Sequence, residues 1–551
     1  MTRRPMPLAA GLVLVALIAV LAGSQLGLVG GSAAGSPSPS SGAVAGGGTA
    51  RPTAPAPTET ETPGGGTPGP TRTADATTAP PTELADVPIV PVTNFRSTFT
   101  GASPKDVPAI LAGTSNSYDT LALVADEAPA ILSALQIEDT APAHVVLFDD
   151  AQALTKDFAK NRKRLAFLRA DAVGPGVRAL LWDHKTLFGV DRIKNLDDWR
   201  LTARLPAAAP GEAFDPSTTW TLFAGGDIML DRGVYLTLKK KGADFPFDGG
   251  TAEITGRCKD CSPLGWDTPY TRRTGGAGVV RDLVKGADIA AANFENPAPD
   301  NPRFHASGTN FSADPRFIDG LANAGIDYVS LANNHIRDAG SAGLLQTIKN
   351  VKKRGIAVSG AGKDLAAARK PAILEAAGTK VAILGYDAIA GGYHATATKV
   401  GSAGLSAKAV KADVAAARKA GADVVIVYPH WGTEYDPTPF ANQKNLAEMI
   451  IDSGADMVIG NHAHWAGAME VYKGKPIWYA LGNFVFDQTW SEPTMEGITL
   501  ELTFRGKDLV QARMRPHIIL DKAQPNLLDP AGSGKVVMGQ VFSASKGLLP
   551  W

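Results

Sequence analysis

A pattern of glycine followed by an apolar strand recurs five times in the second half of the chain and limits the folds open to it. Glycine just after a helix takes the left-handed conformation that ends the helix, and the stretches before these glycines carry apolar residues at helical spacing. The strands are apolar on both faces, which is typical of strands covered by helices. We therefore expect an α/β fold, a layered sheet with flanking helices. The repeats cover residues 286–295, 325–335, 355–362, 421–432 and 454–464.

The ordered chain is expected to divide into a small and a large domain. Strand-like and helix-like stretches alternate over residues 93–212 and predict a small α/β domain of unknown role. The large domain is expected at 219–516, where turns at Lys-Gly-Lys and Arg-Gly-Lys indicate hairpins near the end of the sheet. Residues 517–551 are expected to form a C-terminal tail.

The first 92 residues predict an exported protein on a tether. Two arginines precede an apolar run from Leu8 to Ala22, the layout of a secretory signal, so residues 1–30 are expected to be a signal peptide or signal anchor. Residues 31–92 are rich in Pro, Gly, Ser and Thr and contain no aromatic residue, which predicts a disordered linker. We expect the protein outside the cell, anchored to the outer face of the membrane or secreted into the cell wall.

The charge balance excludes one class of partner. The 551 residues include 54 Lys and Arg and 54 Asp and Glu, so the formal net charge is zero. Proteins that neutralise a nucleic-acid backbone carry a basic excess on the domain that binds it. We therefore expect no nucleic-acid partner.

The two cysteines of the sequence, Cys258 and Cys261, form one Cys-x-x-Cys motif. A zinc site needs four ligands, and the sequence contains no second motif of this kind. A redox motif would open a helix after a strand, whereas the Gly, Pro and Lys around this pair are typical of a loop. For an exported protein, we expect a structural disulfide.

Polar side chains gather at the carboxyl ends of the predicted strands, where ligands bind in open α/β sheets. Four of the nine histidines follow strands of the large domain, together with two carboxylates and several side-chain amides. Imidazoles and carboxylates without a thiolate suit Mn, Fe or Zn. The candidate metal ligands are Asp227, Glu295, Asn334, His430, His462 and His464.

Six candidate ligands exceed what one tetrahedral zinc needs, so we expect two divalent ions (Mn, Fe or Zn). Two ions about 3.5–4 Å apart that share a carboxylate can activate water and clamp a transition state. Because two carboxylates cancel only two of the four positive charges, the site is expected to prefer an anionic substrate. His335 follows a candidate ligand and is the candidate general acid; alternatively, residues 333–335 cap the next helix.

Several motifs make the chain resemble the CapA family of capsule or poly-γ-glutamate synthesis proteins: GGDIMLDRGV, NFENP, SLANNHIRDAG, YPHWGTEY and GNHAHWAGAMEVYKGKPIWYALGNFVFDQ. The resemblance covers about residues 220–490. It implies a fold similar to that of the calcineurin-like metallophosphoesterases, in which one acid bridges the metals; Glu295 takes that position. The other positions implied are Asp227 as the first acid, Asn334 with His335 as the Asn-His pair, His430 as the isolated histidine, and Gly460, His462 and His464 as the last element.

The chain departs from the phosphatase pattern at two of these positions. Gly-Asp-Ile-Met stands where phosphatases have Asp-x-His, and Glu295 stands where they have Asp. These departures argue against simple phosphoester hydrolysis and against assuming that both metal positions are filled.

Further candidates are expected near the mouth of the site. Asp231 and Arg232 are candidate catalytic residues that contact substrate carboxylates, with a salt link at a helix start as the alternative. Aromatic residues after the strand ends are expected to line a polymer groove or, alternatively, to pack under the loops. The insertion 245–276 is a candidate lid. The substrate-binding candidates are Asn333, Trp431, Glu434, Tyr435, Trp465 and Asn483.

Three functions fit these features. The first is an exported, membrane-tethered protein that acts in synthesis, export or processing of an anionic capsule polymer such as poly-γ-glutamate, through a metal-dependent hydrolase or transferase site. The second is a non-enzymatic, polymer-binding subunit of a capsule synthesis complex, and the third is a secreted metallophosphodiesterase. The expected partners are an anionic cell-envelope polymer, the membrane through the N-terminal segment, and subunits of such a complex.

Overall fold

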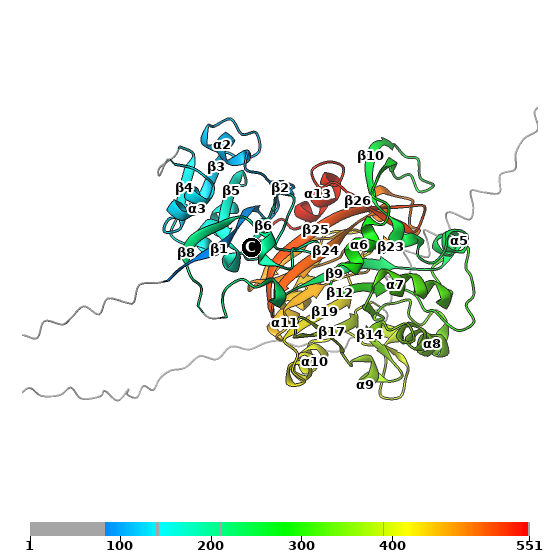
Figure 1. The fold of residues 1–551 in the computed structure, drawn as a ribbon. Helices are drawn as coiled ribbons and strands as arrows, with labels where there is room; N and C mark the ends of the chain where they lie inside the picture. Colours follow the sequence, from blue (N-terminus) through cyan, green and yellow to red (C-terminus); the bar gives the residue numbers. More distant parts are fainter. Residues whose placement is uncertain (1–82, 139–142, 210, 390, 549–550) are drawn as a thin grey trace, which may run out of the picture. The chain divides into compact units, whose positions relative to one another are not determined.

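Two β-sheets packed face to face form the centre of the large domain in the computed structural model (Figure 1). The strands of the first sheet are β9 (Thr219–Ile228), β10 (Thr251–Cys258), β11 (Thr268–Gly275), β12 (Ile289–Phe294), β13 (Tyr328–Ser330), β14 (Ala357–Ser359), β23 (Asn483–Val485), β24 (Glu496–Arg505), β25 (Asp508–Leu520) and β26 (Gln524–Leu528). The strands of the second sheet are β16 (Ala372–Ala376), β17 (Thr379–Asp387), β19 (Val424–His430), β20 (Met457–Ile459), β21 (Met469–Tyr472) and β22 (Lys475–Trp478).

The structure describes residues 83–138, 143–209, 211–389, 391–548 and 551. The expected signal segment and most of the expected linker lie outside these residues. Within the described part of the chain, no helix combines the length and the apolar character needed to cross a membrane.

Both sheets are mixed, with a run of parallel strands and antiparallel hairpins. The first has the order β11-β10-β26-β25-β24-β9-β12-β13-β14, with β23 also beside β9, and the second has the order β16-β17-β19-β20-β22-β21. Strands β9, β12, β13 and β14 are parallel, as are β17, β19, β20 and β22. The hairpins β24–β25 and β21–β22 are antiparallel. The expected change to antiparallel strands near the end of the domain is therefore confirmed.

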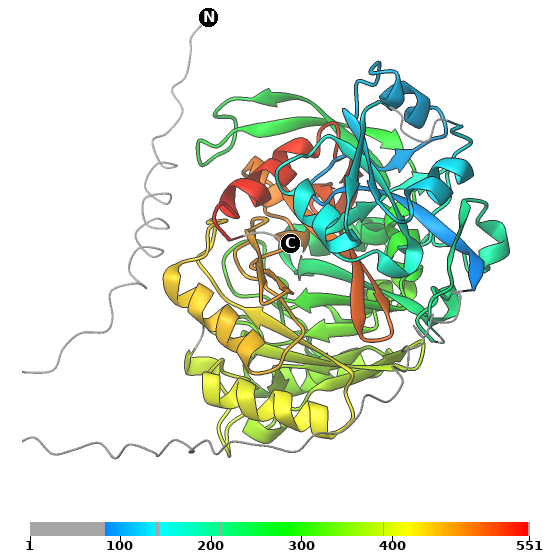
Figure 2. The same ribbon diagram turned by 90° about the vertical axis from the view of Figure 1, so that its left-hand side faces the viewer.

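Helices cover the outer face of each sheet, so the layers run helix, sheet, sheet, helix (Figures 1 and 2). This confirms the expected α/β class, although the sequence did not indicate that the five repeated strands belong to two sheets. The helices packed on the first sheet are α5 (Arg232–Lys241), α6 (Val279–Lys285), α7 (Ile318–Ala324) and α8 (Gly340–Lys352). Those on the second are α9 (Leu365–Ala368), α10 (Ala407–Lys419) and α11 (Ala441–Asp452).

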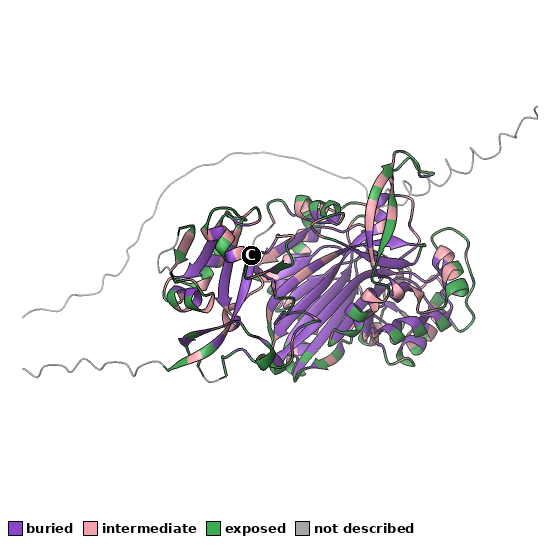
Figure 3. Cartoon of the chain, turned by 45° about the horizontal axis from the view of Figure 1, so that its top comes forward, coloured by how far each residue is buried: buried purple, intermediate pink, exposed green. Residues whose placement is uncertain are grey.

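Alternate side chains of the central strands enter different layers. On β9, Leu222 packs between the sheets and Phe223 packs toward the helices. On β19, Ile426 packs between the sheets and Val427 faces the helices of the other side. Because both faces are covered, the strands are buried along their length (Figure 3), as the apolar runs predict.

The glycines of the five repeats take the expected left-handed conformation at four positions but not at Gly286. The four have φ between 81° and 100°, whereas Gly286 has φ −76°. A Cβ atom at Gly286 would lie 2.8 Å from the carbonyl oxygen of Asp282 and 3.2 Å from Cβ of Val190. Close approach, and not a left-handed turn, explains glycine at this position. The four left-handed glycines are Gly325, Gly355, Gly421 and Gly454.

A separate sheet with its own hydrophobic cluster forms the N-terminal part of the described chain. Its order is β4-β3-β5-β1-β6, with β8 beside β1. Strand β1 begins at Leu84, so the expected linker 31–92 is too long at its C-terminal end. The four apolar residues Val87, Ile89, Val90 and Val92 are buried in the sheet although the strand contains two prolines. The elements are β1 (Leu84–Asn94), β3 (Thr120–Val124), β4 (Val145–Phe148), β5 (Arg164–Arg169), β6 (Val177–Ala179), β8 (Thr202–Pro206), α2 (Asp106–Leu111), α3 (Ala128–Ala134) and α4 (Ala151–Phe158).

The segment 517–551, expected to be a tail, is part of the large domain. Strand β25 continues through residue 516, and β26 pairs with both β25 and β10. Helix α13 (Lys535–Ala544) buries Val537 and Val541 in the cluster between the two sheets. These residues complete the first sheet and its core.

Gln511 on β25 joins the small sheet to the large one. Its side-chain oxygen accepts a hydrogen bond from the backbone N–H of Ala179 (3.0 Å), and its side-chain nitrogen donates to the carbonyl of Val177 (2.9 Å). All of these groups are buried. One amide side chain of β25 therefore satisfies two backbone groups of β6.

Replacing this amide should weaken the fold. Gln511→Ala leaves one buried N–H and one buried C=O unsatisfied, which should lower the free energy of unfolding by about 2–4 kcal/mol. Urea unfolding measures this change. The control Gln346→Ala removes an exposed amide–backbone hydrogen bond and should change stability by less than about 0.5 kcal/mol. Equal effects of the two substitutions would contradict the assigned role of Gln511.

Candidate metal centre

The six predicted ligands come together where the strands of both sheets end. Asp227 is near the end of β9, Glu295 directly follows β12, and His430 is the last residue of β19. Asn334 comes from the loop after β13, and the two histidines His462 and His464 come from the loop after β20. The strand-end pattern of the sequence thus placed these side chains at one location, although they belong to two different sheets.

Glu295 lies at the centre of the group. Its side chain is fully buried, and neither carboxylate oxygen has a hydrogen-bond partner among the described residues. One of these oxygens lies 3.5 Å from Nε2 of His430 and 3.9 Å from Nε2 of His464. The third imidazole, that of His335, has its Nε2 at 4.0 Å. A buried carboxylate with no hydrogen bond is costly, so this position calls for a cation.

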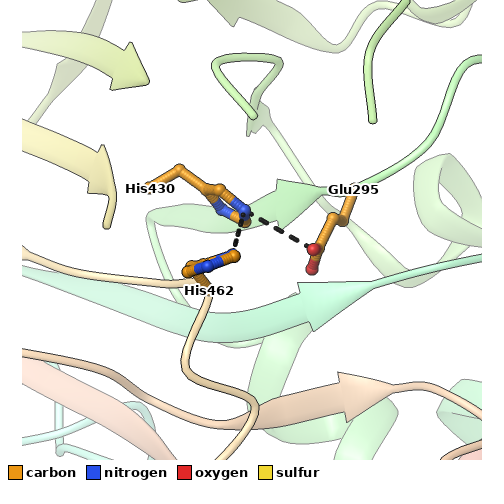
Figure 4. Close-up of side chains that lie close together, drawn as sticks. All are labelled: Glu295, His430 and His462. Atoms are coloured by element: carbon orange, nitrogen blue, oxygen red, sulfur yellow. Dashed lines mark hydrogen bonds and ion pairs between the residues drawn. The ribbon is translucent and has the colours of Figure 1, made fainter. Parts of the chain in front are cut away.

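Two sets of potential ligand atoms share Glu295. Glu295, His430 and His462 form one set, shown in Figure 4, and in each set the atoms lie within 4.8 Å of one another. Asp227, Glu295 and His464 form the second. The shared glutamate gives the arrangement expected of a carboxylate that bridges two ions.

Close contacts between nitrogens and oxygens in the first set support the same interpretation. Nδ1 of His462 lies 3.0 Å from Nε2 of His430, and that same Nε2 lies 2.8 Å from the side-chain oxygen of Asn334. Imidazole nitrogens, a carboxylate and an amide oxygen converge here without a thiolate. This donor set suits Mn, Fe or Zn.

The local backbone aims the two histidines of the last loop. His462 has φ 95° and His464 has φ 58°, conformations that are uncommon for residues with a side chain. Strained backbone of this kind is tolerated where surrounding structure fixes it, often at functional sites. At Gly226, beside Asp227, a Cβ atom would lie 1.8 Å from the carbonyl oxygen of Gly482, so only glycine lets β9 approach the segment just before β23.

A chain of buried hydrogen bonds orients His464. Nδ1 of His464 lies 2.9 Å from the side-chain oxygen of Asn483, whose own side-chain nitrogen donates to Gln488 (3.0 Å) and to the carbonyl of Thr494 (2.9 Å). Nε2 of the buried His517 donates to the backbone carbonyl of Asn483 (2.8 Å). With Nδ1 occupied, His464 directs Nε2 toward Glu295. Asn483, expected to bind substrate, therefore positions a candidate ligand.

Two further polar residues of the site were not among the predicted ligands. The side-chain nitrogen of Asn293 contacts Asp227 (2.8 Å) and Nδ1 of His430 (3.2 Å), and so links the two sheets. Asp387 ends β17 directly opposite His430 in the register, and its carboxylate accepts a hydrogen bond from Ser402 (2.8 Å). The signal for Asp387 was present, because VAILGYD ends in an acid just as TLFAGGD does.

His335 is held beside the candidate ligands by an acid that the sequence analysis did not single out. Its Nδ1 lies 2.9 Å from the carboxylate of Asp338, and its ring packs on Phe311 at 4.3 Å between centroids. Nε2 then faces Glu295. The alternative that residues 333–335 cap the next helix is wrong, because α8 begins at Gly340 and its N-cap is Ala339.

The structure gives Asp231 and Arg232 structural contacts. Asp231 is fully buried, caps α5, and accepts hydrogen bonds from the backbone of Ser312 (2.8 Å) and from both the backbone and Nδ1 of His305 (3.2 and 2.7 Å). Arg232 pairs with Asp487. The predicted salt link at this helix start thus involves Asp487 and not Asp231.

Arg232 also lies over two rings that contact histidines of the site. Its guanidinium is 4.9 Å from the ring of Phe311 and 5.6 Å from that of Phe486. These rings pack on His335 and His464, respectively. The contacts support a positioning role for Arg232.

Two predicted substrate contacts are buried in the protein. Trp431 is 1% exposed and donates its indole N–H to the carbonyl of Tyr479 (3.0 Å), so the packing alternative holds for this aromatic. Asn333 is also buried, and its side chain donates to the carbonyl of Phe294 (2.9 Å). Neither side chain is available to a ligand.

Two other predicted contacts, Tyr435 and Trp465, form an aromatic wall beside His464. The predicted Glu434 lies next to Tyr435. The ring of Tyr435 stacks on His464 at 5.9 Å and contacts Trp465 at 6.4 Å. Burial, followed by the neighbouring Glu434, raises the pKa of Tyr435, so its hydroxyl stays protonated. Trp465 contacts Trp266, which lies on the β10–β11 hairpin. Glu434, Tyr435 and Trp465 are partly buried and remain candidates for substrate binding.

The insertion 245–276 forms the β10–β11 hairpin, and Cys258 and Cys261 are disulfide-bonded near its tip. Arg257 on the hairpin makes two hydrogen bonds to Glu492 (2.6 and 2.7 Å). Together with Trp266, this pair fixes the hairpin next to the aromatic wall. The hairpin remains a candidate lid.

Electrostatics at the site follow from burial and from the two carboxylates. Burial, followed by the neighbouring His430, lowers the pKa of His462 and keeps it neutral, the form that binds metal. Burial acts in the same direction on His464, but Glu295 and Asp227 outweigh it and raise the pKa of His464 to about 9. The carboxylates therefore draw positive charge into the site, as a metal site requires.

Comparison with known proteins gives one family match. Residues 221–488 match the family model described as "Bacterial capsule synthesis protein PGA_cap". The chain is 32% identical over 279 residues to "Capsule biosynthesis protein CapA" of Bacillus anthracis, covering 49% of this chain and 61% of that protein. It is 30% identical over 270 residues to "PGA biosynthesis protein CapA" of Bacillus subtilis, covering 48% of this chain and 63% of that protein. The chain thus spans less than two thirds of the length of these relatives.

Other similar proteins include a more distant relative and solved structures. The chain is 29% identical over 328 residues to a "Probable polyglutamine synthesis accessory protein" of Mycobacterium tuberculosis, covering 56% of this chain and 82% of that protein. The calcineurin-like phosphoesterase YfkN of Bacillus subtilis has a TM-score of 0.32 at 12% identity, covering 59% of this chain and 96% of that one. A 5′-nucleotidase precursor of Thermus thermophilus has a TM-score of 0.33 at 14% identity, covering 60% and 58%. TM-scores this low support no conclusion about the function of this chain.

The buried His517 should make stability depend on pH. Burial lowers its pKa from 6.5 to about 4, so between these values the unfolded chain binds a proton that the folded chain does not. This difference should cost on the order of 3 kcal/mol of stability as the pH falls from 6.5 to 4. In His517→Gln this loss should disappear, as measured by urea unfolding between pH 7 and pH 4. The control His184→Gln changes an exposed histidine and should lose as much stability between pH 7 and pH 4 as the wild type. If His517→Gln lost as much stability as the wild type, the pH dependence would not come from His517.

Proposed function

Since residues 221–488 belong to the bacterial capsule synthesis family that includes the CapA proteins, we propose that this protein acts in the synthesis, export or processing of an anionic capsule polymer such as poly-γ-glutamate. We propose that it does so as a metal-dependent hydrolase or transferase. The observation that carries the enzymatic part is the buried Glu295 carboxylate, which has no hydrogen bond among the described residues and is shared by two sets of ligand atoms.

The donor set fits two divalent ions. Asn334, His430, His462 and Glu295 would hold one, and Asp227, His464 and Glu295 would hold the other. When bound, such ions supply Lewis-acid polarisation of the scissile group and positive charge for an anionic substrate. The two carboxylates cancel only two of four positive charges, which favours a polymer that carries carboxylates.

Side chains around the ions supply the remaining chemistry. Asp338 accepts a hydrogen bond from Nδ1 of His335 and fixes the ring so that Nε2 faces Glu295, where it can donate a proton to a leaving group. Asn293 and Asn483 keep His430 and His464 in fixed orientations. The aromatic wall with Tyr435 can hold the polymer next to His464.

The proposal includes a location outside the cell. The apolar run in residues 1–30 and the Pro/Gly/Ser/Thr-rich stretch that follows support export and a tether that keeps the enzyme near the membrane. Subunits that synthesise or transport the polymer would then be its neighbours.

Metal should stabilise the protein through Glu295. At a metal concentration about 100 times the dissociation constant, binding should add about 2.7 kcal/mol to the free energy of unfolding. Glu295→Gln should remove most of this gain and lower the metal content, because the variant loses the shared charge. The metal-free variant should be at least as stable as the metal-free wild type, since a buried carboxylate without a hydrogen bond has been removed. Thermal unfolding with and without Mn²⁺, together with elemental analysis, measures these changes.

The control for this experiment is Glu496→Gln. Glu496 is buried, and burial, followed by the nearby Glu492, raises its pKa well above the ordinary value, which favours the neutral carboxyl group. The substitution should leave the response to Mn²⁺ unchanged. Wild-type protein that gains no stability from Mn²⁺, Fe²⁺ or Zn²⁺ would contradict the metal centre.

The activity itself is tested with poly-γ-glutamate as the probe. Incubation with metal-loaded protein should shorten the polymer, as measured by size-exclusion chromatography. His335→Gln should lower kcat by about 10²-fold or more with little change in KM, whereas His184→Gln should match the wild type. Binding of the polymer without any change in its length would favour the non-enzymatic subunit. Turnover of bis(p-nitrophenyl) phosphate alone would favour the phosphodiesterase.

A further inference from the structure

Three arginines meet in a cavity between the small sheet and the large one, away from the metal ligands. Arg178 comes from β6, and Arg513 and Arg515 come from β25, where two-residue spacing puts them on the same face. The cavity has a volume of about 190 Å³ and is also lined by Thr100, Thr186 and Asp191. None of its lining residues belongs to the candidate metal centre.

Two of the arginines share one carboxylate. Glu501 on β24 is fully buried and lies 2.5 Å from Nε of Arg515 and 3.6 Å from Nη1 of Arg513. Its carboxylate also accepts a hydrogen bond from the backbone N–H of Val190 (2.9 Å). The neighbouring arginines hold the pKa of Glu501 at about 2, although burial alone would raise it. The charge of Glu501 is therefore balanced by Arg513 and Arg515.

The third arginine is left without an acid. Arg178 is partly buried, donates one hydrogen bond to the carbonyl of Ser97 (2.9 Å), and forms no ion pair with any residue that the structure describes. Asp191, which also lines the cavity, is exposed to solvent, so water screens its charge. Burial, followed by the nearby Arg513 and Arg515, lowers the pKa of Arg178 to about 10. Three guanidinium groups thus face one buried carboxylate.

A second polar group beside Arg178 also lacks a partner. The hydroxyl of Tyr118 is buried and makes no hydrogen bond within the described part of the chain. It is close enough to Arg178 for the two groups to influence each other's pKa. Buried polar groups are normally paired, so an unbonded hydroxyl near a guanidinium that has no acid partner indicates that a further polar group belongs here.

We propose that this cavity binds an oxyanion, the carboxylate or phosphate group of an acidic ligand, between Arg178 on one side and Arg513 and Arg515 on the other. Guanidinium groups match both anions with paired hydrogen bonds. Pockets for drug-sized ligands measure about 300–1,000 Å³, so the smaller cavity suits a single charged group. The small domain would then contribute half of an anion site, and one acidic ligand could be held by both sheets.

The test uses the full chain treated with a metal chelator, so that its result does not depend on the metal centre. The probes are tri-γ-glutamate, a choice that rests on the proposed function, and inorganic phosphate. Isothermal titration calorimetry should show binding to the wild type that Arg178→Met weakens by about tenfold or more. Arg178→Lys, which keeps the charge but loses the planar fork, should fall between them. The control Arg200→Met changes an exposed arginine of the same domain and should bind like the wild type.

Each outcome of this experiment decides between named alternatives. Binding of tri-γ-glutamate that depends on Arg178 supports the site and identifies a carboxylate as its ligand; such binding of phosphate alone supports the site with free phosphate as the source. No binding of either probe, or equal binding by Arg178→Met, overturns the proposal. Without a probe, Arg178→Met should unfold at the same temperature as the wild type or higher, because no acid loses its partner. A lower unfolding temperature would instead assign Arg178 a structural role and overturn the proposal.

Discussion

The carboxylate of Glu295 is the group on which the rest of the candidate site depends. It is buried among imidazoles, and neither oxygen has a hydrogen bond within the described residues. Removing such a charge from water costs several kcal/mol even after the protein relaxes. Other buried carboxylates of the described residues have such partners: Glu501 pairs with two arginines, and Asp231 accepts hydrogen bonds from backbone N–H groups. Glu295, in contrast, has only imidazoles around it and no hydrogen bond within the described residues, and two sets of metal-ligand atoms meet at its carboxylate.

The two-sheet architecture makes this position possible. The parallel strands of each sheet all end at the same edge of that sheet. Packing the two sheets face to face brings these two edges together. Asp227 and Glu295 come from one sheet, while His430 and His462 come from the other. Asn293 crosses between the sheets by bonding to Asp227 and His430. A site with ligands from both sheets depends on the alignment of the whole sandwich, which the shared core between the sheets fixes.

The sequence predicted the ligands better than it predicted their surroundings, and there is a physical reason. A polar residue directly after an apolar strand must lie at the sheet edge, whichever sheet the strand joins, so Asp227 and His430 were found without knowledge of the topology. The position of Trp431 could not be found in this way, because the direction of a side chain after a strand depends on the following turn. Arg232 pairs with Asp487, more than 200 positions away along the chain, and His464 contacts Asn483, 19 positions away. No local sequence pattern predicts such pairs.

The proposed metal centre requires that two cations share Glu295. The most direct measurement is an anomalous difference map from crystals of the full chain soaked in Mn²⁺. It should contain two peaks, one between Glu295 and the pair His430 and His462, and one between Glu295, Asp227 and His464. A map with no peak at Glu295, or with manganese bound only elsewhere, would contradict the claim.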